Sequence, residues 1–209
     1  MEDVLDVYLR PFDPLCPLVT LDEASKQLIS ETRLGIAMAP GQIRCVDAEY
    51  RRNGTASVFM INVPLEGKRH VRVREHRKRE DFAEVIRELC DELYPDAQKI
   101  VLVMDNLNTH NIASLYQALE PEMARRLARK LEIHYTPKHG SWLNMAEIEL
   151  SVLSRQCMNT YFETQDQLAA AITEWERLRN NKQTGIDWQF TTAKARTKLK
   201  RLYPILLEK

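Results

Sequence analysis

The chain has 209 residues, which is enough for one domain with a substantial hydrophobic core. Its 30 basic and 30 acidic side chains balance, so net charge alone favours no class of partner. Four cysteines, at positions 16, 45, 90 and 157, form no Cys-x-x-Cys pair, which is typical of reduced thiols in a cytosol and argues against a disulfide framework or a zinc site. No apolar run approaches the ~20 residues that span a bilayer, and the acidic N-terminus has no signal-peptide pattern, so we expect a cytoplasmic protein without a membrane partner.

The first part of the chain predicts a strand-rich half. Residues 1–16 are expected to form a short helix or a linker, because three prolines interrupt them. A short strand over 18–21 then ends at Asp22 and Glu23. Further strands are expected over 55–63 and 70–75. Three strands joined in sequence favour an antiparallel meander.

The second part alternates helices with two more strands. A helix is expected over 78–94, and the apolar run 99–104 is typical of a central strand covered on both faces. The later elements are a helix capped by Asn111, a short helix from Pro121, a strand over 131–136, and helices over about 145–159, 164–180 and 192–203. This order predicts an α/β fold with a mixed five-stranded sheet flanked by helices.

Three carboxylates are candidates for a metal site. Asp105 follows the central strand directly, at the edge where open α/β sheets bind ligands. Asp22 follows a similar strand, and Glu147 lies in a helix that is entered from the loop after 131–136. Such a set could hold two Mg²⁺ ions, which prefer oxygen ligands and together clamp the attacking and leaving oxygens of a phosphodiester.

Each candidate has an alternative. Asp105 could close an Asx turn, and Glu23 could replace Asp22 as the ligand. Glu147 has capping-box spacing from Asn144, so it could merely cap its helix.

Helical phase also sets Glu147 against Glu149, because the two are ~200° apart and only one can face the sheet. A core stripe through Ala146, Leu153 and Cys157 favours Glu147.

Other polar residues compete less well for this chemistry. Asp47 lies in a strand-like stretch, but Glu49 and two arginines follow at once, which suits a solvated hairpin. His110, His134 and His139 match no zinc spacing. Trp142 is expected to pack at the start of the Glu147 helix rather than stack on a base.

Two stretches resemble a known family closely. Asp-Asn-Leu-Asn-Thr-His at 105–110 and Tyr-Thr-Pro-Lys-His-Gly-Ser-Trp-Leu-Asn-Met-Ala-Glu-Ile-Glu at 135–149 are similar to the second and third catalytic motifs of bacterial insertion-sequence transposases, in the mariner-like superfamily of D-D-E transposases. The resemblance extends to Asp187-Trp-Gln-Phe-Thr-Thr. It implies an RNase H-like fold with Asp22, Asp105 and Glu147 as catalytic metal ligands. Where the family continues its first Asp-Glu with Lys or Arg, this chain has Ala24-Ser25.

The resemblance also implies an activity. Two Mg²⁺ ions, for which Mn²⁺ can substitute, would support cleavage at the ends of a mobile DNA element, and the freed 3′-hydroxyl would attack target DNA. The implied partners are DNA and a second copy of the chain, in the bacterial cytoplasm at the nucleoid. Rival readings are an RNase H-type nuclease that cuts without joining, and a domesticated or inactive DNA-binding derivative.

The domain organisation follows from the same comparison. We expect an N-terminal arm over 1–16, an RNase H-like catalytic domain over 17–182, and a basic C-terminal extension over 183–209 packed on it. The family carries helix-turn-helix modules ahead of its catalytic domain, and only 21 residues precede Asp22 here. We therefore expect a fragment, a split-gene product or a truncated copy.

Supporting residues are predicted around the carboxylates. Those expected to contact phosphate or water near the metals are Asn106, His110, His139 and Asn144. The basic clusters 68–79, 125–130 and 194–201 would flank the site. The DNA contacts predicted by name are Lys138, Arg125, Arg129, Lys194, Lys198 and Arg201. The last three recur at helical spacing and are expected to share one face.

Overall fold

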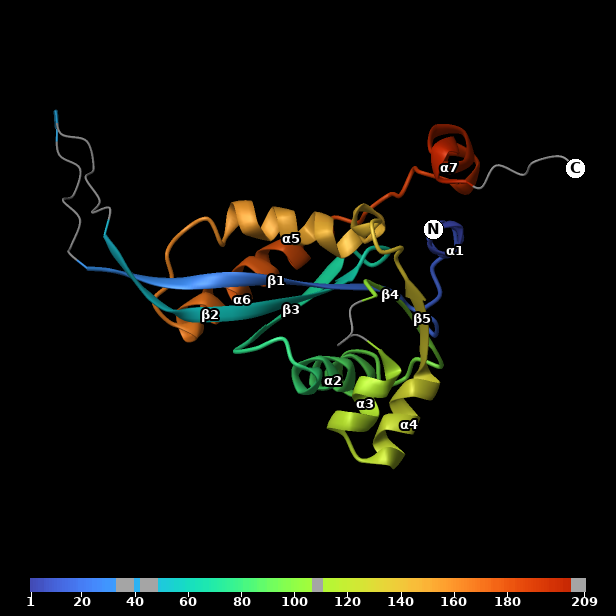
Figure 1. Cartoon of the computed structure of the whole chain (residues 1–209), viewed down its shortest axis with the longest axis horizontal. Helices are drawn as coiled ribbons and strands as arrows, with labels where there is room; N and C mark the ends of the chain where they lie inside the picture. Colours follow the sequence, from blue (N-terminus) through green and yellow to red (C-terminus); the bar gives the residue numbers. More distant parts are fainter. Residues whose placement is uncertain (33–39, 42–48, 107–110, 204–209) are drawn as a thin grey trace, which may run out of the picture.

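The fold is built on one mixed sheet. The computed structural model describes residues 1–32, 40–41, 49–106 and 111–203. Within these ranges five strands form the sheet in the order β3-β2-β1-β4-β5 (Figure 1). The strands are β1 (Leu18–Glu31), β2 (Tyr50–Val63), β3 (Lys68–Arg74), β4 (Ile100–Met104) and β5 (Leu131–Tyr135).

The strand directions confirm the predicted meander. β1 pairs antiparallel with β2, and β2 pairs antiparallel with β3. β4 and β5 are added in parallel on the other side of β1. All five residues of β4 are buried, as its continuous apolar run predicts for a strand covered on both faces.

Helices cover both faces of the sheet. The α-helices are α1 (Glu2–Val7), α2 (Arg79–Glu88), α3 (Ile112–Ala118), α4 (Pro121–Lys130), α5 (Met145–Gln156), α6 (Gln165–Asn181) and α7 (Thr192–Lys198). A π-helical turn, Leu89–Leu93, continues α2, and 3₁₀ turns occupy Ser141–Leu143 and Lys200–Leu202. In Figure 1, α2, α3 and α4 lie on one side of the sheet and α5 on the other. None of the helices in the described ranges is long and apolar enough to cross a membrane.

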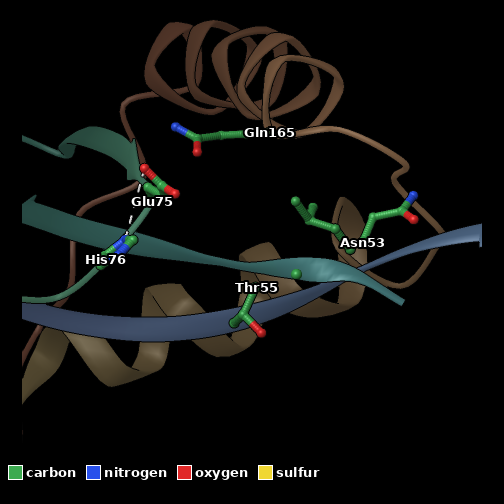
Figure 2. Close-up of a pocket in the computed structure, with 7 residues that line it drawn as sticks. Asn53, Thr55, Glu75, His76 and Gln165 are labelled. Atoms are coloured by element: carbon green, nitrogen blue, oxygen red, sulfur yellow. Dashed lines mark ion pairs between the residues drawn. The ribbon is translucent and has the colours of Figure 1, made fainter. Parts of the chain in front are cut away.

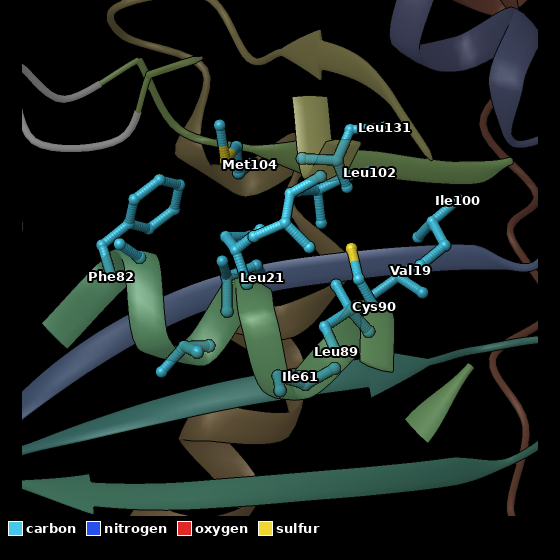
Figure 3. Packing of buried hydrophobic residues seen from close by; sticks show 14 of the residues in the cluster. Val19, Leu21, Ile61, Phe82, Leu89, Cys90, Ile100, Leu102, Met104 and Leu131 are labelled. Carbon is cyan, nitrogen blue, oxygen red and sulfur yellow. The ribbon is translucent and has the colours of Figure 1, made fainter. Parts of the chain in front are cut away.

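The side chains of the strands alternate between two buried layers. Val19 and Leu21 of β1, with Leu102 and Met104 of β4, pack against α2 (Figure 3). Residues on the opposite face, such as Met60 of β2, pack with the buried side of α5 and with α6. This period-two pattern decides which face each polar strand residue occupies.

β1 is much longer than the sequence predicts. The short strand expected over 18–21 runs on to Glu31, so Asp22 lies within β1 rather than at its end. Residues 22–27 are mostly polar, and hydrophobic pattern alone gives them no strand signal. They remain extended because their backbone groups pair with β2, with Asp22 opposite Met60. The two strands project together as an arm from the rest of the molecule (Figure 1).

The two ends of the described chain pack against β4 and the start of β1. Val4 and Leu5 of α1 are fully buried, with Val101, Val103 and Leu143 in the same cluster. Ala195 of α7 joins this cluster. Across the surface, Arg196 of α7 donates to Glu2 of α1 at 2.7 Å. Leu143 and Met145, at the start of the helix that carries Glu147, therefore pack in the same cluster as α1 and α7.

Candidate active site

Asp22 and Asp105 occupy the same face of the sheet. Leu21 points to the α2 layer, so its neighbour Asp22 points the other way, as does its cross-strand partner Met60. On β4, Met104 belongs to the α2 layer, so alternation turns Asp105 to the α5 side as well.

Strand register brings these two aspartates level with each other. β1 and β4 pair in parallel, with Leu18 opposite Val101 and Thr20 opposite Val103. Two residues further along, the same offset reaches Asp22 and Asp105. Asp105 follows the end of β4 as expected, whereas Asp22 lies inside β1, which continues to Glu31.

Asn144 fixes the start of α5 beside Asp22. Its side-chain Nδ2 donates to the carbonyl of Leu21 at 2.9 Å, and its Oδ1 accepts from the backbone N–H of Ala146 at 3.1 Å. Asn144 is 1% exposed. Asn144 was predicted to support the metal ligands or to contact phosphate; its amide caps α5 and ties the helix to β1.

Glu147 lies in the first turn of α5 and is exposed to solvent. The capping-box alternative required its side chain to reach the backbone N–H of Asn144. That N–H donates instead to the carbonyl of Ser141 at 2.7 Å. The positive end of the helix dipole favours a carboxylate at this position.

The charges of Asp105 and Glu147 both act on Asp22. The pKa of Asp22 is raised to about 7, chiefly by burial and also by the charges of Glu23, Asp105 and Glu147, against a backbone hydrogen bond from Glu23 that lowers it. That bond, from the Glu23 N–H to Asp22 Oδ1, is 2.8 Å long. A buried acid among like charges is costly to ionise, and a bound cation would offset that cost.

The site chemistry fits a divalent cation, but the side chains are not gathered around a common centre. Within the described ranges, no three Asp, Glu, His or Cys side chains cluster closely enough to hold a metal ion. Oxygen donors from Asp22, Asp105 and Glu147 are nevertheless the ligand type that Mg²⁺ and Mn²⁺ prefer.

The predicted stripe of Ala146, Leu153 and Cys157 does pack in the core, but the expectation that Glu147 faces inward beside it was wrong. Glu149, not Glu147, faces the core, where it is 1% exposed among Ala146, Leu150 and Leu153. A carboxylate can occupy this position because two arginines pair with it, Arg69 at 2.9 Å and Arg179 at 3.0 Å. Burial favours a raised pKa for Glu149, but hydrogen bonds and charge from Arg179 and Arg69 outweigh it and hold the pKa below its ordinary value.

This pairing separates the roles of the two glutamates. Glu149 is committed to the arginines, whereas the charge of Glu147 reaches Asp22. The partners of Glu149 lie 80 and 30 residues away in sequence, so nothing local in α5 identifies them.

The loop after β5 brings other predicted residues to the same edge. The Thr136 N–H donates to the carbonyl of Met104 at 2.9 Å, which keeps the ends of β4 and β5 together. Lys138 and His139 follow in an exposed turn, and Asn106 is exposed directly after Asp105. His110, like Asp47, lies outside the described residues.

Three arginines of the basic cluster 68–79 form ion pairs with glutamates of the same chain. Arg69 pairs with Glu149, Arg72 donates to Glu88 at 2.5 Å, and Arg74 also pairs with Glu88. These three arginines are therefore engaged with glutamates, and the expectation that cluster 68–79 flanks the site stays a prediction.

The named DNA-contact candidates fall in three places. Lys138 lies in the turn after β5, at the same edge of the sheet as Asp105. Arg125 and Arg129 are exposed on α4, which leads into the start of β5 at the opposite end of the strands. Lys194 and Lys198 are one helical turn apart on α7, but the helix ends at Lys198 and Arg201 lies in a separate 3₁₀ turn. The expected single face therefore holds for the two lysines only.

His134 and Trp142 have structural partners. His134 lies 2.8 Å from Asp3 and 3.0 Å from Glu132, so it links α1 to β5. Trp142 is 44% exposed and makes an edge-to-face contact with Phe190, with 5.6 Å between the ring centroids.

A surface hollow of about 390 Å³ lies elsewhere on the sheet (Figure 2). Its lining includes Leu28, Asn53, Thr55, Glu75, His76 and Gln165. Leu28 is six residues further along β1 than Asp22, which is roughly 20 Å at ~3.3 Å per residue. The hollow is therefore separate from the carboxylates.

Comparisons with known proteins give the same fold. The model of the DDE superfamily endonuclease family matches residues 17–169. No match was found among curated proteins. The crystal structure of the Mos1 mariner paired-end complex with Mn is similar at a TM-score of 0.59 and 16% identity, over 88% of this chain and 54% of that chain. The Mos1 strand transfer complex gives a TM-score of 0.59 and 15% identity, over the same shares of the two chains.

A simian T-cell lymphotropic virus intasome in complex with a PP2A regulatory subunit is also similar, at a TM-score of 0.50 and 11% identity, over 93% of this chain and 59% of that chain. This chain spans little more than half the length of the Mos1 chains. The family match covers most of the chain and includes Asp22, Asp105 and Glu147. With its RNase H-like sheet, the chain belongs to the DDE superfamily of endonucleases.

Proposed function

We propose that this chain is the catalytic domain of a DDE transposase, with Asp22, Asp105 and Glu147 as ligands for two Mg²⁺ ions. The observation that carries the proposal is that the charges of Asp105 and Glu147 both act on Asp22, although the three residues come from two strands and a helix. Mn²⁺ has the same preference for oxygen ligands and is expected to substitute.

Each residue has a distinct part in the chemistry. The chemistry that bound ions would supply is polarisation of the phosphodiester and activation of the attacking water or 3′-hydroxyl. Asp22 and Asp105 contribute from neighbouring strands, so the sheet sets their separation. Glu147 contributes from the first turn of α5, whose position beside Asp22 is fixed by Asn144.

Polar and basic side chains at the same edge would bind the DNA backbone. Lys138 and His139 are exposed directly beyond β5, and Asn106 directly beyond β4. Lys194, Lys198 and Arg201 would extend the contact, with Arg125 and Arg129 touching a more distant part of the duplex. Such contacts position the backbone without reading its sequence.

The proposed setting follows that of the similar structures. The Mos1 structures include paired-end and strand transfer complexes, with Mn or with Mg. By analogy, this chain would act on element ends and target DNA as a homodimer, at the nucleoid of a bacterial cell. We also propose the boundaries 1–16, 17–182 and 183–209 for the arm, the catalytic domain and the basic extension.

Cleavage and joining test the proposal directly. The full chain, with Mn²⁺, is incubated with supercoiled plasmid to score nicking, and with a duplex ending in a 3′-hydroxyl plus plasmid to score joining. We expect both products, and Asp105→Asn should abolish both. Asp96→Asn, which changes an exposed aspartate away from the site, is the matched control and should retain both.

The rival readings give different results in the same assays. Nicking without joining would indicate an RNase H-type nuclease. DNA binding without either product would indicate an inactive derivative. Activity that survives Asp105→Asn, or excess chelator, would contradict the two-metal site.

A further inference from the structure

The most completely buried charge in the described chain lies next to the proposed site. Arg69 of β3 is 0% exposed, and Glu149 of α5 is 1% exposed. Arg69 binds Glu149 through Nε at 2.9 Å and Nη2 at 3.0 Å. Arg179 of α6 binds the same carboxylate through Nε at 3.2 Å and Nη2 at 3.0 Å. One carboxylate therefore accepts two arginine forks from two different elements.

The arginines are themselves held in place. Arg69 Nη1 donates to the carbonyl of Gly67 at 2.6 Å, and Nη2 also donates to the carbonyl of Thr184. The backbone of Arg69 exchanges two hydrogen bonds with the Asn180 side chain, at 2.8 and 2.7 Å. Glu149 is thus attached to a frame made of β3, α6 and the segment that follows α6.

The attachment acts on the helix that presents Glu147. Glu149 follows Glu147 by two residues, which places the two side chains on nearly opposite sides of α5. Asn144 is one directional contact, which holds the start of α5 against β1. The packing of Ala146, Leu150 and Leu153 buries one side of the helix, but apolar contacts do not prescribe an exact rotation about its axis. The bidentate contacts at Glu149 supply the second directional contact, and they prescribe a direction as well as a distance.

We propose that Glu149 is a positioning residue for Glu147: clamped between Arg69 and Arg179, it fixes the rotation of α5 and so the direction in which the Glu147 carboxylate points. The inference rests on the proposed function of Glu147 as a metal ligand. A well-packed apolar side chain can stabilise a core as well as a buried ion pair does, but it prescribes no angular setting.

Arg179→Met separates positioning from simple electrostatics. This change removes a positive charge near the carboxylates, so a purely electrostatic influence would tighten Mn²⁺ binding. Loss of positioning would weaken it. Arg179 is also 19% exposed in its side chain, which makes it easier to replace than Arg69.

The experiment measures Mn²⁺ binding to the full chain from the electron paramagnetic resonance signal of free Mn²⁺. We expect Glu149→Gln and Arg179→Met to weaken binding about 10- to 100-fold, as is typical when a residue that orients metal ligands is lost. Arg179→Lys, which keeps the charge but not the fork, should weaken it as well. Arg177→Met is the matched control, because it breaks an exposed ion pair with Glu174 on the same helix, and it should bind Mn²⁺ like wild type.

A second readout does not depend on metal. Hydrogen exchange of the amides in residues 145–150, measured below the unfolding transition, should accelerate in Arg179→Met and not in Arg177→Met. If Glu149→Gln fails to fold, Arg179→Met decides alone. Folded Arg179→Met with unchanged exchange in α5 and equal or tighter Mn²⁺ binding would overturn the proposal. If wild type binds no Mn²⁺, the proposed function fails, and exchange in α5 still tests the clamp.

Discussion

At the scale of single residues, Asp22 and Glu149 differ in whether arginines neutralise the charge of the carboxylate. Asp22 is half-buried among other acids, and its pKa is raised to about 7. Glu149 is more deeply buried, yet its pKa is lowered by two arginines. An acid that remains costly to ionise is suited to bind a cation, whereas a neutralised acid is suited to hold the structure.

Replacing Asp22 should stabilise the metal-free protein. Asp22→Asn removes a half-buried carboxylate and its repulsion from Asp105 and Glu147, so we expect a gain on the order of 2 kcal/mol in the free energy of unfolding. Urea unfolding in excess chelator measures it, and the same variant should lose cleavage. A loss of stability with Asp22→Asn would show that Asp22 has a stabilising partner.

The two glutamates of α5 should respond oppositely to the same substitution. Glu149→Gln leaves two arginines without their carboxylate, which typically costs about 3–5 kcal/mol for a buried pair. Glu147→Gln changes an exposed side chain and should stay within about 0.5 kcal/mol of wild type. Thermal or urea unfolding of both variants, compared side by side, checks the difference. An equal loss of stability in the two variants would contradict the assignment of Glu149 as the buried, paired glutamate.

At the scale of secondary-structure elements, the sequence predicts well wherever a residue pattern is local. The apolar run of β4 and the Asn111 cap of α3 appear as expected, the cap accepting from the Ser114 N–H at 3.0 Å. The length of β1 and the burial of Glu149 on α5 do not. Polar residues after Asp22 form strand only because β2 supplies their hydrogen bonds, and Glu149 is buried only because two distant arginines supply its charge. Both outcomes depend on contacts that no sequence window contains.

The contact between the terminal helices should depend on pH. Hydrogen bonds from Arg196 chiefly lower the pKa of Glu2 from 4.5 to about 2. A lowered folded-state pKa contributes stability that is present above the unfolded value of about 4.5 and is lost as pH falls toward about 2. Carbon-13 NMR of the Glu2 carboxyl should therefore show a depressed midpoint, and high salt should move it upward because the pair is exposed to solvent.

Two substitutions check this assignment. Arg196→Gln should return the Glu2 midpoint toward its ordinary value, whereas Arg177→Gln, which lies in an unrelated ion pair, should leave it unchanged. A midpoint near 4.5 in the wild-type protein would contradict the contact between α1 and α7.

At the scale of the whole molecule, charge is divided between internal pairs and an exposed remainder. The chain is neutral overall, and Arg69, Arg72 and Arg74 are engaged with internal glutamates. Lys194 and Lys198 are exposed, although Lys194 also donates to the carbonyl of Gln189 at 2.7 Å. The chain should therefore bind DNA weakly, in a salt-dependent way and with little sequence preference.

The salt dependence identifies the contacts. If Lys194 and Lys198 both touch phosphates, changing both to glutamine should flatten the slope of log affinity against log salt by about 1.8 on duplex DNA, at ~0.9 per contact. Lys182→Gln, at an exposed lysine with no proposed role, should leave the slope unchanged. An unchanged slope in the double variant would show that α7 is only a solvated surface. Tight, salt-insensitive binding to one duplex would contradict the prediction that the chain binds DNA with little sequence preference.

The central claim is that Asp22, Asp105 and Glu147 bind divalent metal together. Crystals of the chain soaked in Mn²⁺, with data collected for anomalous scattering from manganese, test it most directly. We expect manganese peaks within ligand distance, ~2.0–2.4 Å, of oxygens from all three carboxylates, with Glu149 still paired to Arg69 and Arg179. Manganese bound by Glu149 or elsewhere, with these three carboxylates bare, would contradict it.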